Sequence, residues 1–99
     1  MSTEIRIRRI EPLGDHEYLV ELGDDSGRDP VAARLRAEPE VVDELGLADR
    51  PEPRVVQATA DFLISRQEAW DLPDQVDLFD IAAGYPELGA ELRRRLDAS

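Results

Sequence analysis

The chain of 99 residues contains no cysteine, no lysine, no asparagine and only one histidine, His16. Without cysteine it has no disulfide framework, no thiolate nucleophile and no thiolate metal site, so nothing argues for oxidative folding outside the cell. A lone histidine is a poor metal site, because protein metal centres combine several nitrogen, sulfur or oxygen ligands. These absences predict a protein that is not an enzyme and that holds no metal or cofactor.

Positive charge is also scarce: 12 arginines stand against 23 acidic residues, which gives a formal net charge of −11. This charge repels nucleic-acid phosphate and anionic membranes. No apolar run approaches the roughly 18 residues of a membrane span, and the N-terminus lacks a signal-peptide core. We expect a cytoplasmic protein with a protein partner, without membrane or nucleic-acid binding. The absence of lysine and asparagine fits a GC-rich genome, with a salt-rich cytoplasm as the alternative.

Hydrophobic periodicity predicts a single α+β domain over residues 1–99. Alternating apolar and polar residues predict three antiparallel strands over 3–10, 17–22 and 31–36, with a bulge near Arg8 and a turn over 12–15. Helical spacing, proline and glycine predict helices over 39–45, 54–67, 78–83 and from 86 onward, with Asp77 as N-cap of the third. The expected fold is a small three-stranded antiparallel sheet, about residues 3–37, packed against three to four helices in about residues 39–97.

The last predicted helix carries Leu88, Leu92 and Leu96 at i, i+4 and i+8. Such a narrow apolar stripe must be buried, either within the chain or against a second copy. Because a domain of this size needs most of its apolar area for its own core, we favour a monomer over a homodimer.

The C-terminal half contains VVQATADFLISRQ followed by LPDQVDLFDIAAGYPELGAELRRRL. A helix ending in an apolar triplet precedes a Leu-Pro break, an Asp-Leu-x-x-Ile turn, an aromatic residue before proline, and an arginine-rich helix. This order resembles a group of short uncharacterised bacterial proteins. The resemblance covers residues 55–96 and implies a recurrent fold without a known activity or site.

Two groups of residues are candidates for partner binding. The first consists of four arginines on the predicted first and third strands: Arg6, Arg8, Arg34 and Arg36. They would form a basic stripe if these strands were neighbours, and the stripe could hold an anionic partner. The alternative is that Glu17 and Glu21 of the second strand pair with them, which is the commoner outcome for cross-strand charges.

The second group consists of the large aromatic residues Trp70, Phe79 and Tyr85, which flank the breaks around the third helix. Most large aromatic side chains belong to the core, and burial within the monomer is the first expectation. An interface role is the alternative.

Other polar groups do not form a recognisable site. The acidic loop over residues 24–29 lacks the central glycine and the bidentate glutamate of a calcium loop. The carboxylate pairs of Asp71 with Asp74 and of Asp77 with Asp80 are typical of solvated helix caps. His16 is expected to be an exposed loop residue. The sequence therefore predicts a small acidic protein-interaction module; the alternative is an antitoxin-type or transcription-associated regulator.

Overall fold

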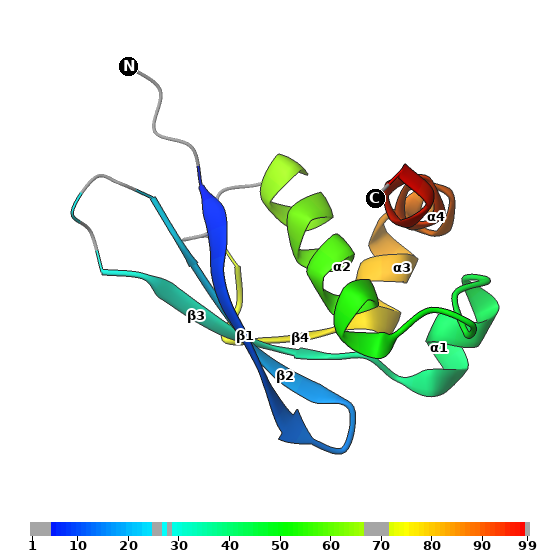
Figure 1. The fold of residues 1–99 in the computed structure, drawn as a ribbon, viewed down its shortest axis with the longest axis horizontal. Coiled ribbons are helices and arrows are strands. Elements are labelled where there is room, and N and C mark those ends of the chain that lie inside the picture. Colours follow the sequence, from blue (N-terminus) through cyan, green and yellow to red (C-terminus); the bar gives the residue numbers. More distant parts are fainter. Residues whose placement is uncertain (1–4, 25–26, 28, 67–71, 99) are drawn as a thin grey trace.

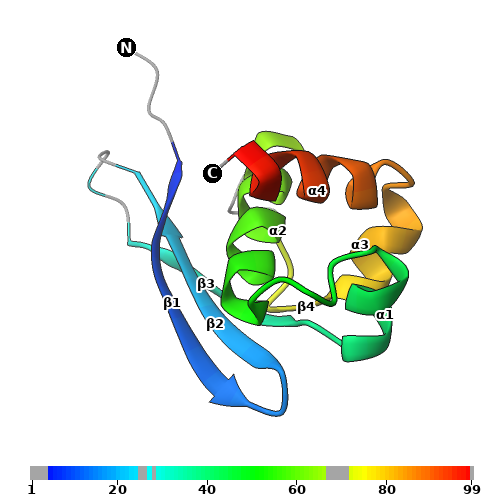
Figure 2. The ribbon, with the colours of Figure 1, turned by 45° about the vertical axis from the view of Figure 1, so that its right-hand side comes forward.

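The structure is a computed structural model that describes residues 5–24, 27, 29–66 and 72–98. It has the α+β class that the sequence predicts, with one sheet and four helices on the same side of that sheet (Figures 1 and 2). The strands are β1 (Arg6–Gly14), β2 (Glu17–Gly23), β3 (Val31–Arg36) and β4 (Gln75–Asp77). The helices are α1 (Pro39–Glu44), α2 (Glu52–Arg66), α3 (Leu78–Gly84) and α4 (Leu88–Ala98).

The sheet has four strands in the order β1-β2-β3-β4, and β4 runs parallel to β3. The prediction of a three-stranded, purely antiparallel sheet within residues 3–37 is therefore wrong. Strand β4 has only three residues, too few to show an alternating pattern in the sequence. Its parallel direction is possible because the chain between β3 and β4, which includes α1 and α2, forms a long crossover.

Strand β1 continues past its predicted end and includes Pro12. Proline is tolerated there because β1 is an edge strand, on which a missing N–H need not break the ladder. The turn consequently lies at Asp15 and His16, which have φ values of 50° and 65°. The predicted bulge is confirmed, since the β1–β2 register shifts between Ile7 and Arg9.

The core lies between the inner face of the sheet and α2. Its strand residues include Tyr18, Val20, Leu22 and Leu35, and its helix residues include Val55, Val56, Thr59, Phe62, Leu63, Leu78, Leu88 and Leu92. The buried Thr59 hydroxyl donates a hydrogen bond of 2.7 Å to the Val55 carbonyl, so it is satisfied within the helix. Leu88 and Leu92 are fully buried within this one chain, whereas Leu96 is only partly buried.

In the part of the chain that the structure describes, no helix lies on the outer face of the sheet (Figure 2). The exposed strand residues of this face include Arg9, Glu11, Ala32, Arg34, Arg36 and Gln75. Among the described residues, no helix is long and apolar enough to span a membrane.

Candidate functional site

The four predicted arginines do not form one basic stripe. Strand β2 lies between β1 and β3, so the condition for the stripe is not met. The Arg8 Nη2 donates a hydrogen bond of 3.0 Å to the Asp24 carbonyl beyond the end of β2. The register places Arg36 opposite Glu17 and Arg34 opposite Leu19, which leaves acidic or apolar neighbours beside each arginine of β3.

Among the described residues, Glu17 and Glu21 do not form the expected cross-strand ion pairs. Arg9 lies opposite Glu21 in the register, but its ion pair is with Glu11 on its own strand, at 2.8 Å. Within the described part of the chain, Arg34 and Arg36 have no carboxylate within ion-pair distance. The outer sheet face is thus a solvated surface of mixed charge.

The three aromatic candidates have different environments. Trp70 lies outside the described residues. Tyr85 is half-buried and packs edge-to-face on Phe62, with 5.2 Å between ring centroids and 86° between ring planes, so it belongs to the core. Phe79, in the first turn of α3, is 63% exposed, which singles it out as an unburied aromatic residue.

Phe79 lies at the start of α3, which contacts α1 (Figure 2). The acidic residues of this region, which we call the acidic end, are Glu38, Glu40, Asp43, Glu44, Asp77 and Asp80. No basic residue occurs in residues 37–49 or 72–92. In the described structure none of these carboxylates forms an ion pair. Arginines from elsewhere in the chain lie at its edges, since Arg36 is paired with Asp77 in the β3–β4 register and the Arg93 side chain reaches Gly46 after α1. Phe79 is therefore an exposed apolar side chain near carboxylates that form no ion pair.

The cap of α3 differs from the prediction. Asp77 occupies the N-cap position, but its side chain makes no capping hydrogen bond, and its Oδ1 is buried without a partner. The Phe79 N–H, which such a cap would satisfy, donates instead to Glu38 Oε2 at 3.0 Å. A carboxylate from the segment before α1 thus satisfies a free donor of α3 and helps to tie the two helices together.

A second polar cluster joins the β1–β2 turn to the start of α2. Glu52 accepts hydrogen bonds from the Tyr18 hydroxyl at 2.8 Å and pairs with His16 Nδ1 at 2.7 Å. Burial, together with the hydrogen bond to the Glu52 carboxylate and its charge, raises the pKa of Tyr18 to about 12. His16 is an exposed turn residue, as the sequence predicts, but its partner Glu52 is too distant in the chain for any motif to connect the two.

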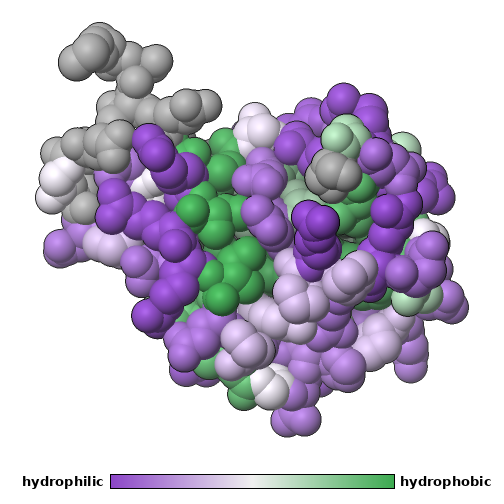
Figure 3. Space-filling view, in the orientation of Figure 1, coloured by the Kyte–Doolittle hydropathy of each residue, from purple (hydrophilic) through white to green (hydrophobic). Residues whose placement is uncertain are grey.

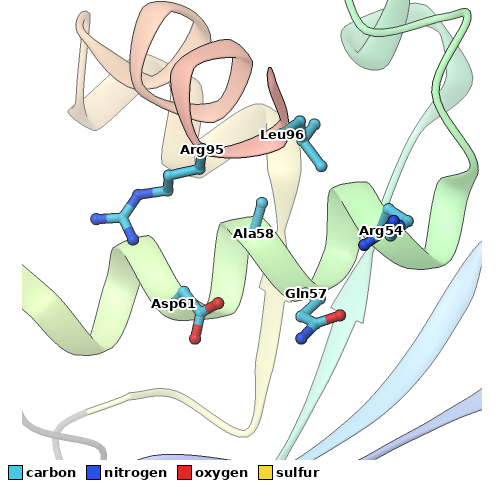
Figure 4. A pocket seen from close by; sticks show the side chains of 6 residues that line it. All are labelled: Arg54, Gln57, Ala58, Asp61, Arg95 and Leu96. Atoms are coloured by element: carbon cyan, nitrogen blue, oxygen red, sulfur yellow. The ribbon is translucent and has the colours of Figure 1, made fainter. Parts of the chain in front are cut away.

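A hollow of about 120 Å³ lies between α2 and α4 (Figure 4). Its lining residues are Arg54, Gln57, Ala58, Asp61, Arg95 and Leu96. The α2 members recur at intervals of three and four residues, so they share one face of that helix. Figure 4 shows Asp61 and Arg95 on one side of the small Ala58 and Arg54 on the other. This hollow could not be predicted from the sequence, because helical spacing alone does not reveal which part of a helix surface is left uncovered.

The charges in this hollow are only partly compensated. Burial raises the pKa of the Asp61 carboxyl, and the nearby Arg95 charge opposes that shift without cancelling it. The Arg95 Nε atom is buried without a hydrogen bond, and lies 3.7 Å from Glu91 Oε2. Asp61 and Arg95 therefore belong to facing helices, yet they do not form a direct ion pair within 4 Å.

Comparison with protein-family models, with curated proteins and with solved structures finds no match. The resemblance of residues 55–96 to short bacterial proteins thus stays a prediction. In the part of the chain that the structure describes, no group of three or more acidic or histidine side chains is placed to hold a metal ion.

Proposed function

We propose that this chain is a protein-binding module and that the acidic end is its docking surface. The observation that carries the proposal is the 63% exposure of Phe79 among carboxylates without ion-pair partners. Exposing an aromatic ring to water is unfavourable, and a partner that covers the ring would recover this free energy. Aromatic residues supply some of the largest contributions to binding at interfaces.

The charge around Phe79 indicates the chemistry of the partner. A segment rich in arginine or lysine, with one apolar side chain to pack on the Phe79 ring, would complement both features of the acidic end. Opposite charge would steer the encounter and increase the association rate, while the apolar contact would determine the residence time. Cation–π contact between a partner cation and the ring would add to this attraction.

The test compares capture of proteins from the native cell lysate by the wild-type chain and by Phe79→Ala. An interface aromatic residue typically contributes about 2 kcal/mol, which corresponds to a roughly thirty-fold loss of affinity. Leu13→Ala is the matched control, because Leu13 is also exposed, at 45%, but lies on β1. The captured protein is then purified, and its affinity for each variant is measured directly.

We expect one protein to be retained by the wild type and by Leu13→Ala and to be lost with Phe79→Ala. Its affinity should fall with added salt and should weaken further with Glu40→Gln combined with Asp43→Asn. Equal retention by the wild type and Phe79→Ala would contradict the proposal. The alternative, an antitoxin-type or transcription-associated regulator, gains no support from the separated arginines; salt-sensitive duplex-DNA binding lost on mutating Arg6 and Arg8 would favour it.

A further inference from the structure

The hollow between α2 and α4 is separate from the acidic end and has the opposite chemistry. Two guanidinium groups, one amide and one carboxyl surround a floor formed by Ala58 and Leu96. In the described structure the Arg54, Gln57 and Asp61 side chains have no hydrogen bond or direct ion pair with other residues. These polar side chains thus line the hollow without forming hydrogen bonds to one another.

The arrangement of Asp61 and Arg95 defines what could join them. These opposite charges lie on facing helices, and no direct ion pair spans the space between them. A ligand that bridges them must present a cation to Asp61 and an anion to Arg95. The Arg95 Nε is buried and lies 3.7 Å from Glu91 Oε2, so a ligand carboxylate would bind the terminal nitrogens of this guanidinium, whose side chain is 33% exposed.

The hollow is small and open to solvent, with a volume of about 120 Å³. A ligand as small as glycine, alanine or serine would lie largely within it, and a larger side chain would extend into solvent. Ala58 and Leu96 offer apolar contact to a small side chain.

We propose that the α2–α4 hollow binds a small free α-amino acid in its zwitterionic form. The ligand ammonium donates to the Asp61 carboxylate, and the ligand carboxylate accepts from the Arg95 guanidinium. Burial of Asp61 within the fold strengthens this contact, because an ion pair is worth more where water is partly excluded. Binding would link α2 to α4 near the C-terminal end of α4.

The experiment is a titration of the ¹⁵N-labelled full chain with L-alanine, followed by amide chemical shifts. We expect saturable shifts centred on Gln57, Asp61 and Leu96. Sodium acetate alone and ethylamine alone, each carrying one of the two charges, should bind at least tenfold more weakly than alanine. Acetate that binds as tightly as alanine would overturn the proposal, as would the absence of saturable shifts with alanine.

Three variants test the assigned contacts. Asp61→Asn and Arg95→Gln should each weaken alanine binding at least tenfold, and Arg94→Gln, on the neighbouring exposed position of α4, should change it less than twofold. Thermal melts are recorded for each, so that loss of binding is compared among folded proteins. Unchanged alanine affinity in Asp61→Asn would refute the role given to the carboxylate.

Discussion

Replacement of Leu92 by alanine tests how the last helix is packed. Leu92 is fully buried within the single chain, where it contributes to the core that α4 shares with α2. Deleting a buried leucine side chain removes its transfer free energy and leaves a cavity, at a cost of about 3 kcal/mol within the usual range for this change. Since a small domain is stabilised by about 5–15 kcal/mol in total, this is a large fraction of its stability.

The assay is thermal unfolding followed by circular dichroism. For a domain of 60–100 residues, 1 kcal/mol shifts the melting temperature by about 4–8 °C, so Leu92→Ala should lower it by roughly 12–24 °C. Leu96→Ala is the matched control on the same helix. Because Leu96 is only partly buried, its loss should cost roughly 1 kcal/mol.

Leu92→Glu separates the two explanations of the leucine stripe. A glutamate at this fully buried position would place an unpaired charge in the core, so we expect the chain to unfold. The reasoning would be refuted by a Leu92→Glu protein that keeps a near-native circular dichroism spectrum and has half the wild-type mass by light scattering. Such a result would show that the stripe forms a seam between two copies.

Three further predictions concern charge. The pKa of Tyr18 is raised to about 12 from its ordinary value of 10.0, so between these pH values the folded chain keeps a proton that the unfolded chain releases. The free energy of unfolding should therefore fall as the pH rises from 10 to 12. Tyr18→Phe should reduce this fall, which urea unfolding at alkaline pH would measure. Because burial raises the pKa of Asp61, its charged form opposes folding, and Asp61→Asn should raise the melting temperature by about 2–4 °C, or roughly 0.5 kcal/mol; a lower melting temperature would mean that Asp61 and Arg95 pair directly in solution. Salt at about 0.15 M screens charges more than about 8 Å apart, which weakens the repulsion among the acidic residues of the folded chain. The melting temperature should therefore rise from low salt to this concentration, and it should rise less in Glu40→Gln combined with Asp43→Asn.

The elements with a clear periodic pattern could be predicted from the sequence. Strands β2 and β3 and helix α2 bury the residues that alternate or recur at helical spacing, because one face of each contacts the core. The prediction failed where the tertiary context decides. Three residues of β4 become a strand only because β3 offers them a free edge, and Pro12 stays in β1 only because that strand is an edge.

The candidate sites show the same limit. Phe79, Tyr85 and Trp70 are close in the sequence, but Phe79 and Tyr85 lie in different environments. Which aromatic ring is exposed depends on what packs over it, and no local pattern contains that information. Asp61 and Arg95 come from helices separated by β4 and α3, so their approach follows from the packing of α4 on α2 alone.

Several features of this chain depart from what local rules favour, and their surroundings explain only some of them. His16 has a left-handed backbone, and its side chain pairs with Glu52. Glu38, from the segment before α1, accepts the Phe79 N–H that Asp77 leaves uncapped at the start of α3. Folding gives no comparable compensation for the exposed ring of Phe79 or for the half-buried Asp61. Because sequences that fold well violate local rules mainly where function requires it, these two positions are the ones to which we assign binding. Their independence is testable, since Phe79→Ala should leave alanine binding unchanged and Asp61→Asn should leave partner capture unchanged.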